Sequence, residues 1–351
     1  MNNIMLALGG LLITLLLLRM SIPLAHRFSL VAIPGQHRRH QGNIPLTGGI
    51  AMSAGAALTL LMIGHLPGAG IAGAVILLLV IGVVDDRFSI PYWIRFLFQI
   101  IAVLLIIWID NVRLVDLGKT FSIETTNLGN YSVALTVFAG VGVINAINMI
   151  DGMDGLAGSL VLVCLLSIFA LLIFSGSEGI DLVVVLSTAV VGFLGFNLRA
   201  IHHRGAKLFM GDAGSMVLGI VLAWLLIRHS QGARASFAPV VALWILAIPL
   251  FDTVGVLLRR SMRRGSPFRA DWMHTHHLLM RLGLDVNQSL ALIVSAAALL
   301  AVAGIVLFLK GTPENYLFYL FLGLFAGYIF LMEIGEYFLR RREAQLDGDD
   351  D

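Results

Sequence analysis

The sequence predicts an all-α integral membrane protein. Three observations support this prediction: the composition, the length of the apolar segments and the placement of the basic residues. Of the 351 residues, 58% are hydrophobic and only 13% are charged, whereas about 25% of the residues of a soluble protein are charged. This composition excludes an ordinary soluble enzyme. It also excludes a disordered chain, because disordered chains are poor in apolar residues and rich in charge.

The apolar segments have the length of transmembrane helices, which need roughly 20 residues to cross a bilayer. They are centred near residues 14, 56, 77, 100, 140, 166, 188, 220, 248, 298 and 326. We therefore predict about eleven transmembrane helices joined by short connections. This division assigns residues 1–338 to a single polytopic membrane domain and residues 339–351 to a charged cytoplasmic tail.

The basic residues predict the orientation of these helices. Arg19 is the first basic residue and follows the first apolar run. No basic segment or cleavage site precedes that run, so we expect an uncleaved first helix with an external N-terminus. Most of the 23 Lys and Arg residues then fall in every second connection and in the C-terminal tail. Because cytoplasmic loops are enriched in Lys and Arg, we predict a cytoplasmic C-terminus.

The connections on the two sides differ in content. The longest external connection covers residues 110–130, and its apolar residues Val112, Leu114, Phe121 and Ile123 predict a short pair of strands. The cytoplasmic connections hold most of the Asp, Asn and His residues. A membrane enzyme that uses a cytosolic substrate requires such one-sidedness. A cation-coupled transporter, the alternative class, would place ionisable groups near the bilayer midplane.

Asp85 and Asp86 close the third predicted helix, in the sequence DDRFS. Adjacent carboxylates at a helix C-terminus face each other's charge and the negative end of the helix dipole. A cation should therefore offset them. An ion pair with Arg87 in a solvated loop is the structural interpretation, whereas a magnesium site or a proton acceptor is the functional one.

Four amide and carboxylate side chains share the segment NAINMIDGMDG: Asn145, Asn148, Asp151 and Asp154. Their spacing of three keeps them on one helical face if the helix continues, and the glycines permit a sharp turn. Such a cluster at a membrane surface indicates ligand binding. Turn and cap formation is the alternative, because Asp and Asn are common in both.

The segment GDAGS begins the eighth predicted helix, after Lys207. A helix N-terminus offers free N–H groups and partial positive charge, so Gly211 and Gly214 would let a phosphate approach while Asp212 held a metal ion. A simple N-cap role for Asp212 is the alternative.

His274, His276 and His277 lie in a connection rich in arginine, which includes Arg259, Arg260, Arg263, Arg264 and Arg269. Zn²⁺ could bind such a cluster, but the cationic surroundings favour a phosphate-bearing partner. A basic loop on anionic lipid would explain some of the arginines but not the histidines.

Asp252 lies inside the ninth apolar segment. Burial there costs about 3 kcal/mol unless the carboxylate has a partner or faces a cavity, so we expect it to support the site.

In this order, the motifs DDRFS, NAINMIDGMDGLAG, FMGDAGS and HTHH resemble those of the polyprenyl-phosphate N-acetylhexosamine-1-phosphate transferases. The resemblance covers essentially the whole chain and includes the basic loop ending in IPLTGG. The HxHH form and the preceding SPF run are similar to the bacterial branch that uses UDP-N-acetylglucosamine, rather than the phospho-MurNAc-pentapeptide branch. One departure is Ser89, where the family pattern shows Asp or Asn.

The resemblance implies an enzyme of the bacterial inner membrane. Its implied reaction transfers N-acetylglucosamine 1-phosphate from UDP-GlcNAc to undecaprenyl phosphate, gives UMP, and initiates a lipid-linked surface polysaccharide such as O-antigen. Another UDP-N-acetylhexosamine is the alternative donor. The resemblance also implies Mg²⁺, with Mn²⁺ as the alternative ion. Membrane lipids are expected partners, nucleic acid is not, and a homodimer is left open.

The resemblance also implies roles for individual residues. The implied catalytic residues are Asp85, Asp86 and Asp151. The implied metal ligands are Asp212, Asn148 and Asp151. The implied substrate-binding residues are Asn145, Asn148, Asp154, Lys207, His274, His276 and His277. Direct attack of the lipid phosphate on the β-phosphate and a covalent aspartyl intermediate both remain open.

Overall fold

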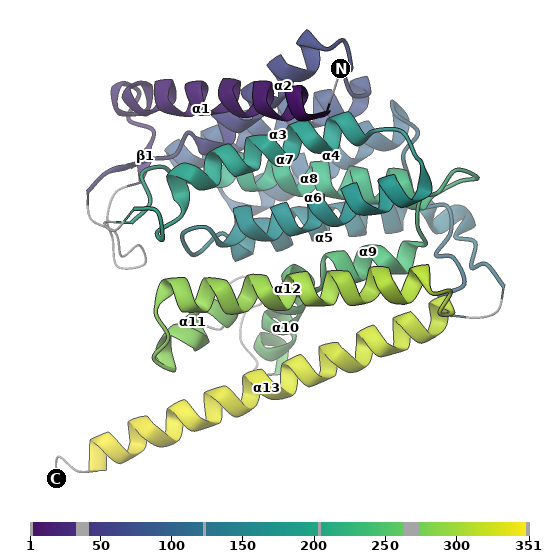
Figure 1. Cartoon of the computed structure of the whole chain (residues 1–351). Helices are drawn as coiled ribbons and strands as arrows, with labels where there is room; N and C mark the ends of the chain where they lie inside the picture. Colours follow the sequence, from purple (N-terminus) through teal and green to yellow (C-terminus); the bar gives the residue numbers. More distant parts are fainter. Residues whose placement is uncertain (1–2, 33–41, 122–123, 203–204, 263–273, 349–351) are drawn as a thin grey trace.

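The computed structural model describes residues 3–32, 42–121, 124–202, 205–262 and 274–348, and these residues are mostly helical. Figure 1 shows most of the helices with their long axes nearly aligned. The helices are α1 (Asn3–Arg27), α2 (Gly48–Met62), α3 (Ala69–Phe88), α4 (Tyr92–Trp108), α5 (Ser132–Ile150), α6 (Leu156–Ser175), α7 (Ile180–Asn197), α8 (Gly211–Ser230), α9 (Pro239–Ile245), α10 (Ala247–Met262), α11 (Thr275–Arg281), α12 (Val286–Leu309) and α13 (Glu314–Gly348), with a 3-10 turn η1 (Gly129–Tyr131) before α5.

The prediction of an all-α membrane protein is confirmed. Within the described residues, 8 helices are long and apolar enough to cross a bilayer, and a bent pair of helices would make a ninth. The 8 helices are α1, α3, α5, α6, α7, α8, α12 and α13. The predicted segments near residues 56 and 100 form α2 and α4, which have only 15 and 17 residues. Every predicted apolar segment is therefore helical, but two are shorter than a full span.

Helix α8 forms the centre of the bundle. It is apolar around its whole circumference, and 89% of its most apolar window is buried, as expected for a helix packed on all sides. Glycines permit close approach of its neighbours. A Cβ on Gly49 of α2 would lie 2.2 Å from the Cα of Gly214, and a Cβ on Gly82 of α3 would lie 2.2 Å from the Cα of Ala213. These contacts hold the N-terminus of α8 against α2 and α3.

The ninth predicted helix is broken, which corrects the expectation of one continuous segment. Helix α9 ends at Ile245, α10 begins at Ala247, and the two helices meet at 79°. Pro249 has no backbone N–H and falls in the first turn of α10, where helices tolerate proline. The break places Asp252 in the second turn of a redirected helix.

The strands also differ from the expectation. Strand β1 (Val31–Ala32) pairs antiparallel with β2 (Ile44–Pro45), which the sequence did not predict. In the connection between α4 and α5, the described residues form one isolated bridge, between Asp116 and Asn127, in place of the predicted strand pair. Ile123 lies outside the described residues, as do residues 37–41 of the basic loop.

Helix α13 is the longest element and extends past the rest of the bundle (Figure 1). It continues without a break through position 338, where the membrane domain was predicted to end.

Candidate active site

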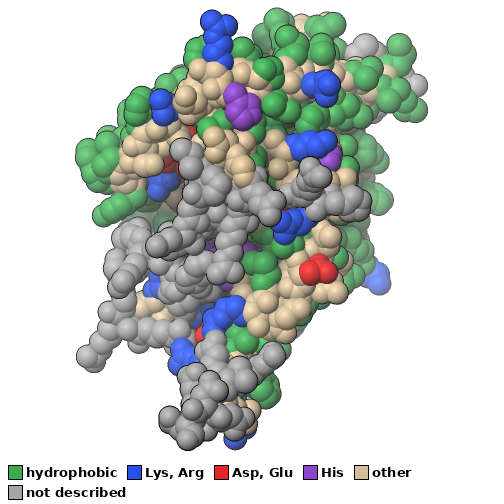
Figure 2. Space-filling model, turned by 90° about the vertical axis from the view of Figure 1, so that its left-hand side faces the viewer, with side chains coloured by type: hydrophobic (Ala, Val, Ile, Leu, Met, Phe, Trp, Pro, Cys, Tyr) green, Lys and Arg blue, Asp and Glu red, His purple; other side chains and the backbone are tan. Residues whose placement is uncertain are grey.

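Four helix ends meet at one end of the bundle and bring distant polar residues together. They are the C-terminal ends of α3 and α5 and the N-terminal ends of α4 and α8. Figure 2 looks onto this end of the molecule, where several Lys and Arg side chains are exposed. Asp85, Arg95, Asn148 and Asp212 form its central contacts.

Asp85 is paired with Arg95 of α4 rather than with the adjacent Arg87. Arg95 Nη1 donates to Asp85 Oδ2 at 2.7 Å, and the backbone N–H of Ile90 donates to Oδ1 at 2.9 Å. The guanidinium of Arg87 instead lies 5.7 Å from the centre of the Phe88 ring. The expected cation is therefore present, but it comes from the next helix, and Asp85 is only 6% exposed.

The side chain of Asp86, on α3, lies against the N-terminus of α8. The N–H groups of Asp212 and Ala213 donate to its carboxylate at 2.9 and 3.3 Å. Gly211 has a φ of 73°, and a Cβ there would lie 2.5 Å from Asp86 Oδ2. The two N–H groups that the sequence assigned to a phosphate thus bind a carboxylate, a favourable arrangement with the helix dipole. Gly214 packs against Gly49 and does not face a ligand.

Asn148 and Asp212 are in direct contact although 64 residues separate them in sequence. Asn148 Nδ2 donates to Asp212 Oδ1 at 2.6 Å and to Ser215 Oγ at 2.9 Å. Arg95 Nη1 lies 3.8 Å from the same Asp212 oxygen. Asp212 is the more accessible carboxylate, with 28% of its side chain exposed. Two of the three predicted metal ligands are therefore neighbours.

The other residues of the NAINMIDGMDG segment point to different partners. Asn145 Nδ2 donates to Gln99 Oε1 at 2.7 Å, one turn below Asn148. Helix α5 ends at Ile150, and Asp151 forms its C-cap, so the expected shared face stops before the aspartates. Asp154 accepts from the N–H of Ala206 at 3.3 Å and lies 3.8 Å from Arg199.

Sequence reasoning missed Gln99, Arg95 and Arg199. Nothing in their local sequence distinguishes them, because each becomes relevant through a contact with another helix or loop. Lys207 is adjacent to Ala206, and its N–H donates to the carbonyl of Phe196, which places it in the same α7–α8 connection as the partner of Asp154.

The family pattern of Asp or Asn at position 89, where this chain has Ser89, has a structural reason. Ser89 ends α3 with a left-handed φ of 50°. Asn and Asp adopt this conformation more readily than other residues with side chains. The family pattern therefore suits the backbone here.

The three histidines pack together beside the NAINMIDGMDG turn. The rings of His276 and His277 are 4.1 Å apart, and those of His274 and His276 are 5.8 Å apart. A Cβ on Gly152 would lie 2.8 Å from His276 Nε2. His276 is 1% exposed. Burial, with a smaller contribution from His277, lowers its pKa to about 3.

The pKa of His277 is also lowered, first by burial and then by His274. His276 and His277 are thus neutral near pH 7 and offer hydrogen bonds rather than charge. Arg263, Arg264 and Arg269, expected to supply charge beside them, lie outside the described residues.

Asp252 has the partners that its burial requires. His274 Nδ1 donates to Asp252 Oδ2 at 2.6 Å, and the N–H and hydroxyl of Thr275 donate to Oδ1 at 2.8 and 2.6 Å. The expected partner is thus present, and it is His274, one of the predicted substrate-binding residues.

The donor set at the helix ends suits a hard cation. Within the described residues, no group of 3 or more His, Cys, Asp or Glu side chains could hold a metal ion, at the histidines or elsewhere. Asp212 and Asn148 nevertheless supply adjacent carboxylate and amide groups. Mg²⁺ usually binds one or two carboxylates and completes its coordination with water and substrate phosphates. These residues therefore fit Mg²⁺ shared with a substrate and not a closed structural site.

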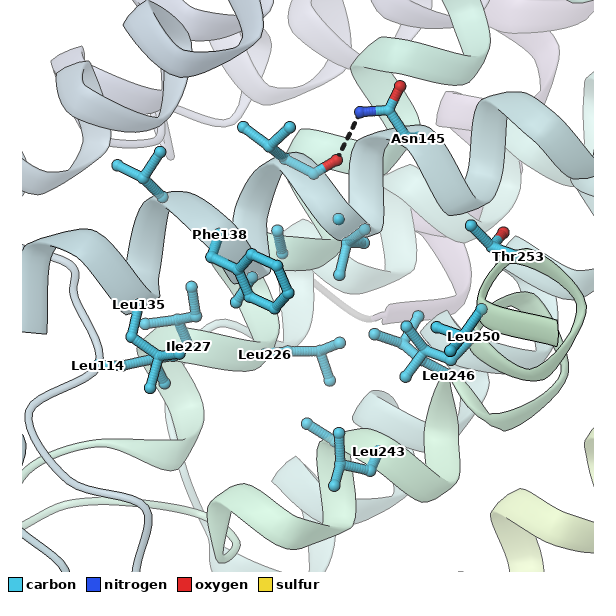
Figure 3. A pocket seen from close by; sticks show the side chains of 18 of the residues that line it. Leu114, Leu135, Phe138, Asn145, Leu226, Ile227, Leu243, Leu246, Leu250 and Thr253 are labelled. Carbon is cyan, nitrogen blue, oxygen red and sulfur yellow. Dashed lines mark hydrogen bonds between the residues drawn. The ribbon is translucent and has the colours of Figure 1, made fainter. Parts of the chain in front are cut away.

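A groove of about 1070 Å³ begins at these polar residues and continues along the bundle. Arg95, Asn148, Arg260 and His274 line its polar part, and apolar side chains of α4, α5, α8, α9 and α10, mainly Leu, Val, Ala, Ile and Phe, line most of the rest. Figure 3 shows Asn145 and Thr253 above Leu226, Leu243 and other apolar side chains. The groove reaches Leu114 and Leu117 in the connection between α4 and α5. Local sequence could not predict this groove, because residues of six separate helices line it: α4, α5, α8, α9, α10 and α13.

The fold and the site define a class: a polytopic membrane protein with a polar site at one end of the bundle and an apolar groove leading from it. Residues 69–230, which run from α3 to α8, match the family model for glycosyl transferase family 4. The chain therefore carries, within that match, the contacts of Asp85, Asn148 and Asp212.

Curated relatives match nearly the whole chain. The undecaprenyl-phosphate alpha-N-acetylglucosaminyl 1-phosphate transferase of Escherichia coli O157:H7 is 38% identical over 321 residues, 90% of this chain and 87% of that protein. The enzyme of the same name from Haemophilus influenzae is 38% identical over 302 residues, 84% of this chain and 83% of that protein. The chain belongs to glycosyl transferase family 4, and the resemblance inferred from its motifs is confirmed.

Proposed function

We propose that the protein transfers N-acetylglucosamine 1-phosphate from UDP-GlcNAc to undecaprenyl phosphate, giving undecaprenyl-diphospho-GlcNAc and UMP. The observation that carries this proposal is the continuity between the Asp212 contacts and the apolar groove. A polyprenyl phosphate has an anionic head and a long apolar tail, and one cavity offers both environments. The names of the curated relatives state the same acceptor and sugar.

The acceptor would lie with its isoprenoid tail against the leucine-lined part of the groove. Its phosphate would then lie at the polar end, near Arg95 and Asn148. Arg95 is held by Asp85, so its guanidinium is already oriented before the phosphate arrives. Preorganised cations of this kind stabilise charge during phosphoryl transfer. In this proposal Asp85 acts on the acceptor through Arg95.

The donor would bind on the side of the NAINMIDGMDG turn. Asp154 would face the uridine, and His276 and His277 would contact the sugar or the pyrophosphate, together with Lys207. His276 supports this assignment, because both of its buried ring nitrogens have no hydrogen-bond partner among the described residues. Buried polar groups are normally satisfied, and a substrate hydroxyl or phosphate would satisfy these nitrogens.

Asp212 and Asn148 would hold Mg²⁺ together with Asp151, with Mn²⁺ as the alternative. When bound, the ion neutralises the negative charge of the diphosphate. Asp86 holds the N–H groups of Asp212 and Ala213, so its contribution to the reaction would be to orient α8 and with it Asp212. Asn145, which is hydrogen-bonded to Gln99, would support the site from one helical turn before Asn148.

The proposed reaction is direct attack of an acceptor oxygen on the β-phosphorus. It replaces one phosphoanhydride bond with another and therefore requires no ATP. A covalent intermediate on an aspartate such as Asp151 is the alternative. The accessible side chain of Asp212 and the paired state of Asp85 favour charge stabilisation by these residues over nucleophilic attack by Asp85.

We also propose eleven membrane segments with an external N-terminus, a cytoplasmic C-terminus and insertion in the bacterial inner membrane. The short helices α2 and α4 and the bent α9–α10 pair would complete the 8 long helices. The site would then face the cytosol, where UDP-sugars are available. A transporter has no support from the comparisons.

The test is incubation of the purified protein with labelled UDP-GlcNAc, undecaprenyl phosphate and Mg²⁺, followed by detection of UMP and lipid-linked sugar. Asp212→Ala and EDTA should each abolish turnover. Asp181→Asn is the control. Asp181 lies on α7 and forms an exposed pair with His65, so this variant should keep turnover. Failure to consume UDP-GlcNAc would refute the proposal, consumption of another UDP-N-acetylhexosamine would change the donor, and UMP release without acceptor would favour the covalent route.

A further inference from the structure

The groove ends at the connection between α4 and α5. Leu114, Leu117 and Phe121 of this connection all line the groove. Figure 3 shows Leu114 beside Leu135 of α5, at the far end of the groove from Asn145. The end opposite the polar site is therefore formed by a loop together with the helix ends that this loop contacts.

This connection is fastened to three helices. Three of its backbone N–H groups donate to side chains of its neighbours. They are those of Leu114, Val115 and Lys119, which donate to Thr136 of α5, to Gln231 at the C-cap of α8 and to Glu314 of α13, at 2.9, 2.7 and 2.9 Å. The ring of Phe121 also packs edge to face on Phe318 of α13, with ring centres 5.1 Å apart. These contacts hold the connection across the end of the groove.

The closed end limits the length of the groove. Leu135 and Asn148 line it near opposite ends and both belong to α5, so a rise of about 1.5 Å per residue separates them by roughly 20 Å. An extended carbon chain advances by about 1.2 Å per main-chain bond, as an extended backbone does. Each isoprene unit adds four such bonds, so roughly four units span this distance. An undecaprenyl chain has many more units than that.

The volume of the groove leads to the same conclusion. Its volume of about 1070 Å³ lies near the upper end of the range for pockets that bind drug-sized ligands, about 300–1,000 Å³, and undecaprenyl phosphate is much larger than such a ligand. The rest of the tail has a way out. Phe96 of α4 and Phe138 of α5 line the groove and are 49% and 77% exposed, so the groove is open along its side.

We infer that the connection between α4 and α5 is the end stop for the acceptor tail, and that the protein recognises only about the first four isoprene units after the phosphate. This inference rests on the proposed function, which places the phosphate at the polar end. Units beyond the stop leave through the open side into the surrounding lipid. They gain no affinity there, because lipid tails are as apolar as the side chains of the groove. Leu114, Leu117 and Phe121 thus set the recognised length.

The first test uses introduced cysteines. Cys164 is the single cysteine of the sequence, is buried and is absent from the groove lining, so an introduced thiol is the reactive one. Leu117→Cys places a thiol at the stop, and Leu250→Cys places one near Thr253, towards the polar end (Figure 3). Labelling of each full-length variant by N-ethylmaleimide in detergent is followed with geranyl, geranylgeranyl or undecaprenyl phosphate present.

Each acceptor is added at about ten times its Kd, where occupancy alone slows labelling of a covered thiol about tenfold. All three acceptors should slow the labelling of Leu250→Cys to this extent. Geranylgeranyl and undecaprenyl phosphate should slow the labelling of Leu117→Cys equally, because both tails reach the stop. Geranyl phosphate has half as many units as geranylgeranyl phosphate and should leave the labelling of Leu117→Cys unchanged.

The second test measures KM for the same acceptors, expressed as a mole fraction in the micelle. The tails lie in an apolar medium before and after binding, so a change in KM reports contacts made in the groove. KM should fall by about tenfold from geranyl to geranylgeranyl phosphate and stay level up to undecaprenyl phosphate. Leu117→Trp brings the stop closer to the phosphate and should raise KM for geranylgeranyl phosphate more than for geranyl phosphate. Leu16→Trp, at an exposed position of α1, is the matched control and should keep every KM.

Several outcomes would overturn the inference: labelling of Leu117→Cys that no acceptor slows, protection of this thiol by undecaprenyl phosphate alone or by geranyl phosphate, or a further fall in KM beyond geranylgeranyl phosphate. If Leu117→Cys does not fold, Leu135→Cys at the same end of the groove takes its place. If the native protein makes no lipid-linked sugar, the proposed function fails. If it is active and Leu250→Cys is protected while Leu117→Cys is not, only the end stop is refuted.

Discussion

The contact between Gly152 and His276 offers a sharp test of the site. Gly152 is not one of the glycines with a positive φ, so its backbone accepts alanine without strain. A Cβ there would nevertheless lie 2.8 Å from His276 Nε2 and 3.0 Å from Cε1. Gly152→Ala therefore perturbs the site by steric contact alone, at a position between Asp151 and Asp154.

The expected magnitude follows from the space available. The imidazole must retreat by roughly half an ångström to reach ordinary van der Waals contact, and it is buried against His277 at 4.1 Å. Overpacking of this kind costs about 1–3 kcal/mol of stability. A 1 Å misplacement can cost about 10²-fold in rate, so half that distance should lower kcat/KM for UDP-GlcNAc by about tenfold.

The assay combines transferase kinetics with denaturant unfolding in detergent. Gly195→Ala in α7 is the matched control, because nothing lies within 4 Å of a Cβ at that glycine, and alanine favours a helix over glycine by up to about 1 kcal/mol. It should keep activity. Combining Gly152→Ala with His276→Ala should remove most of the added stability cost of Gly152→Ala. Native stability and native kcat/KM in Gly152→Ala would refute the packing described here.

Three further predictions concern the charges of the site. Arg95→Gln leaves the buried carboxylate of Asp85 without its cation and should lower the free energy of unfolding by about 3 kcal/mol; adding Asp85→Asn should recover part of this loss, and the absence of any recovery in unfolding experiments would contradict the pairing. Asp86→Asn replaces one of the two carboxyl oxygens that accept from the N–H groups of Asp212 and Ala213 and should cost about 1 kcal/mol, because one N–H group loses its acceptor, with a fall in kcat because Asp212 loses its fixed position; an unchanged unfolding midpoint would count against this role. Because burial lowers the pKa of His276 to about 3, the unfolded chain binds the extra proton between pH 6.5 and pH 3, and stability falls as pH falls through that window. The loss attributable to His276 should reach roughly 2 kcal/mol at pH 5, and His276→Gln should flatten the profile of unfolding free energy between pH 7 and pH 5; an equally steep profile in that variant would argue against the assignment.

Part of the geometry of the candidate site was predictable, because its residues lie in short, ordered motifs. Asn148 and Asp212 were expected to share a ligand, and the structure places them in contact at 2.6 Å. Asp252 was expected to need a partner, since a charge inside an apolar segment is costly, and it has His274 and Thr275. These expectations depend on residue chemistry and on the order of motifs, both of which are local properties of the chain.

Other features were not predictable from local sequence. Arg87 follows Asp86 directly, yet Asp85 pairs with Arg95 because α4 returns along α3 and presents its first turn to the carboxylate. The N-terminus of α8 had the features of a phosphate site, but α3 delivers Asp86 to it first. The bend between α9 and α10 redirects a segment whose composition resembled a continuous span.

The amino-acid sequence by itself determined that this protein is a helical membrane protein and that its candidate site residues lie in a few ordered motifs. Apolar content and segment length decide the first, because the hydrophobic effect and backbone hydrogen bonding act on each segment separately. Only the tertiary structure decided which charges pair and where the apolar groove runs. Those features arise where helices distant in sequence pack together, and the geometry of that packing depends on all of the contacting surfaces at once.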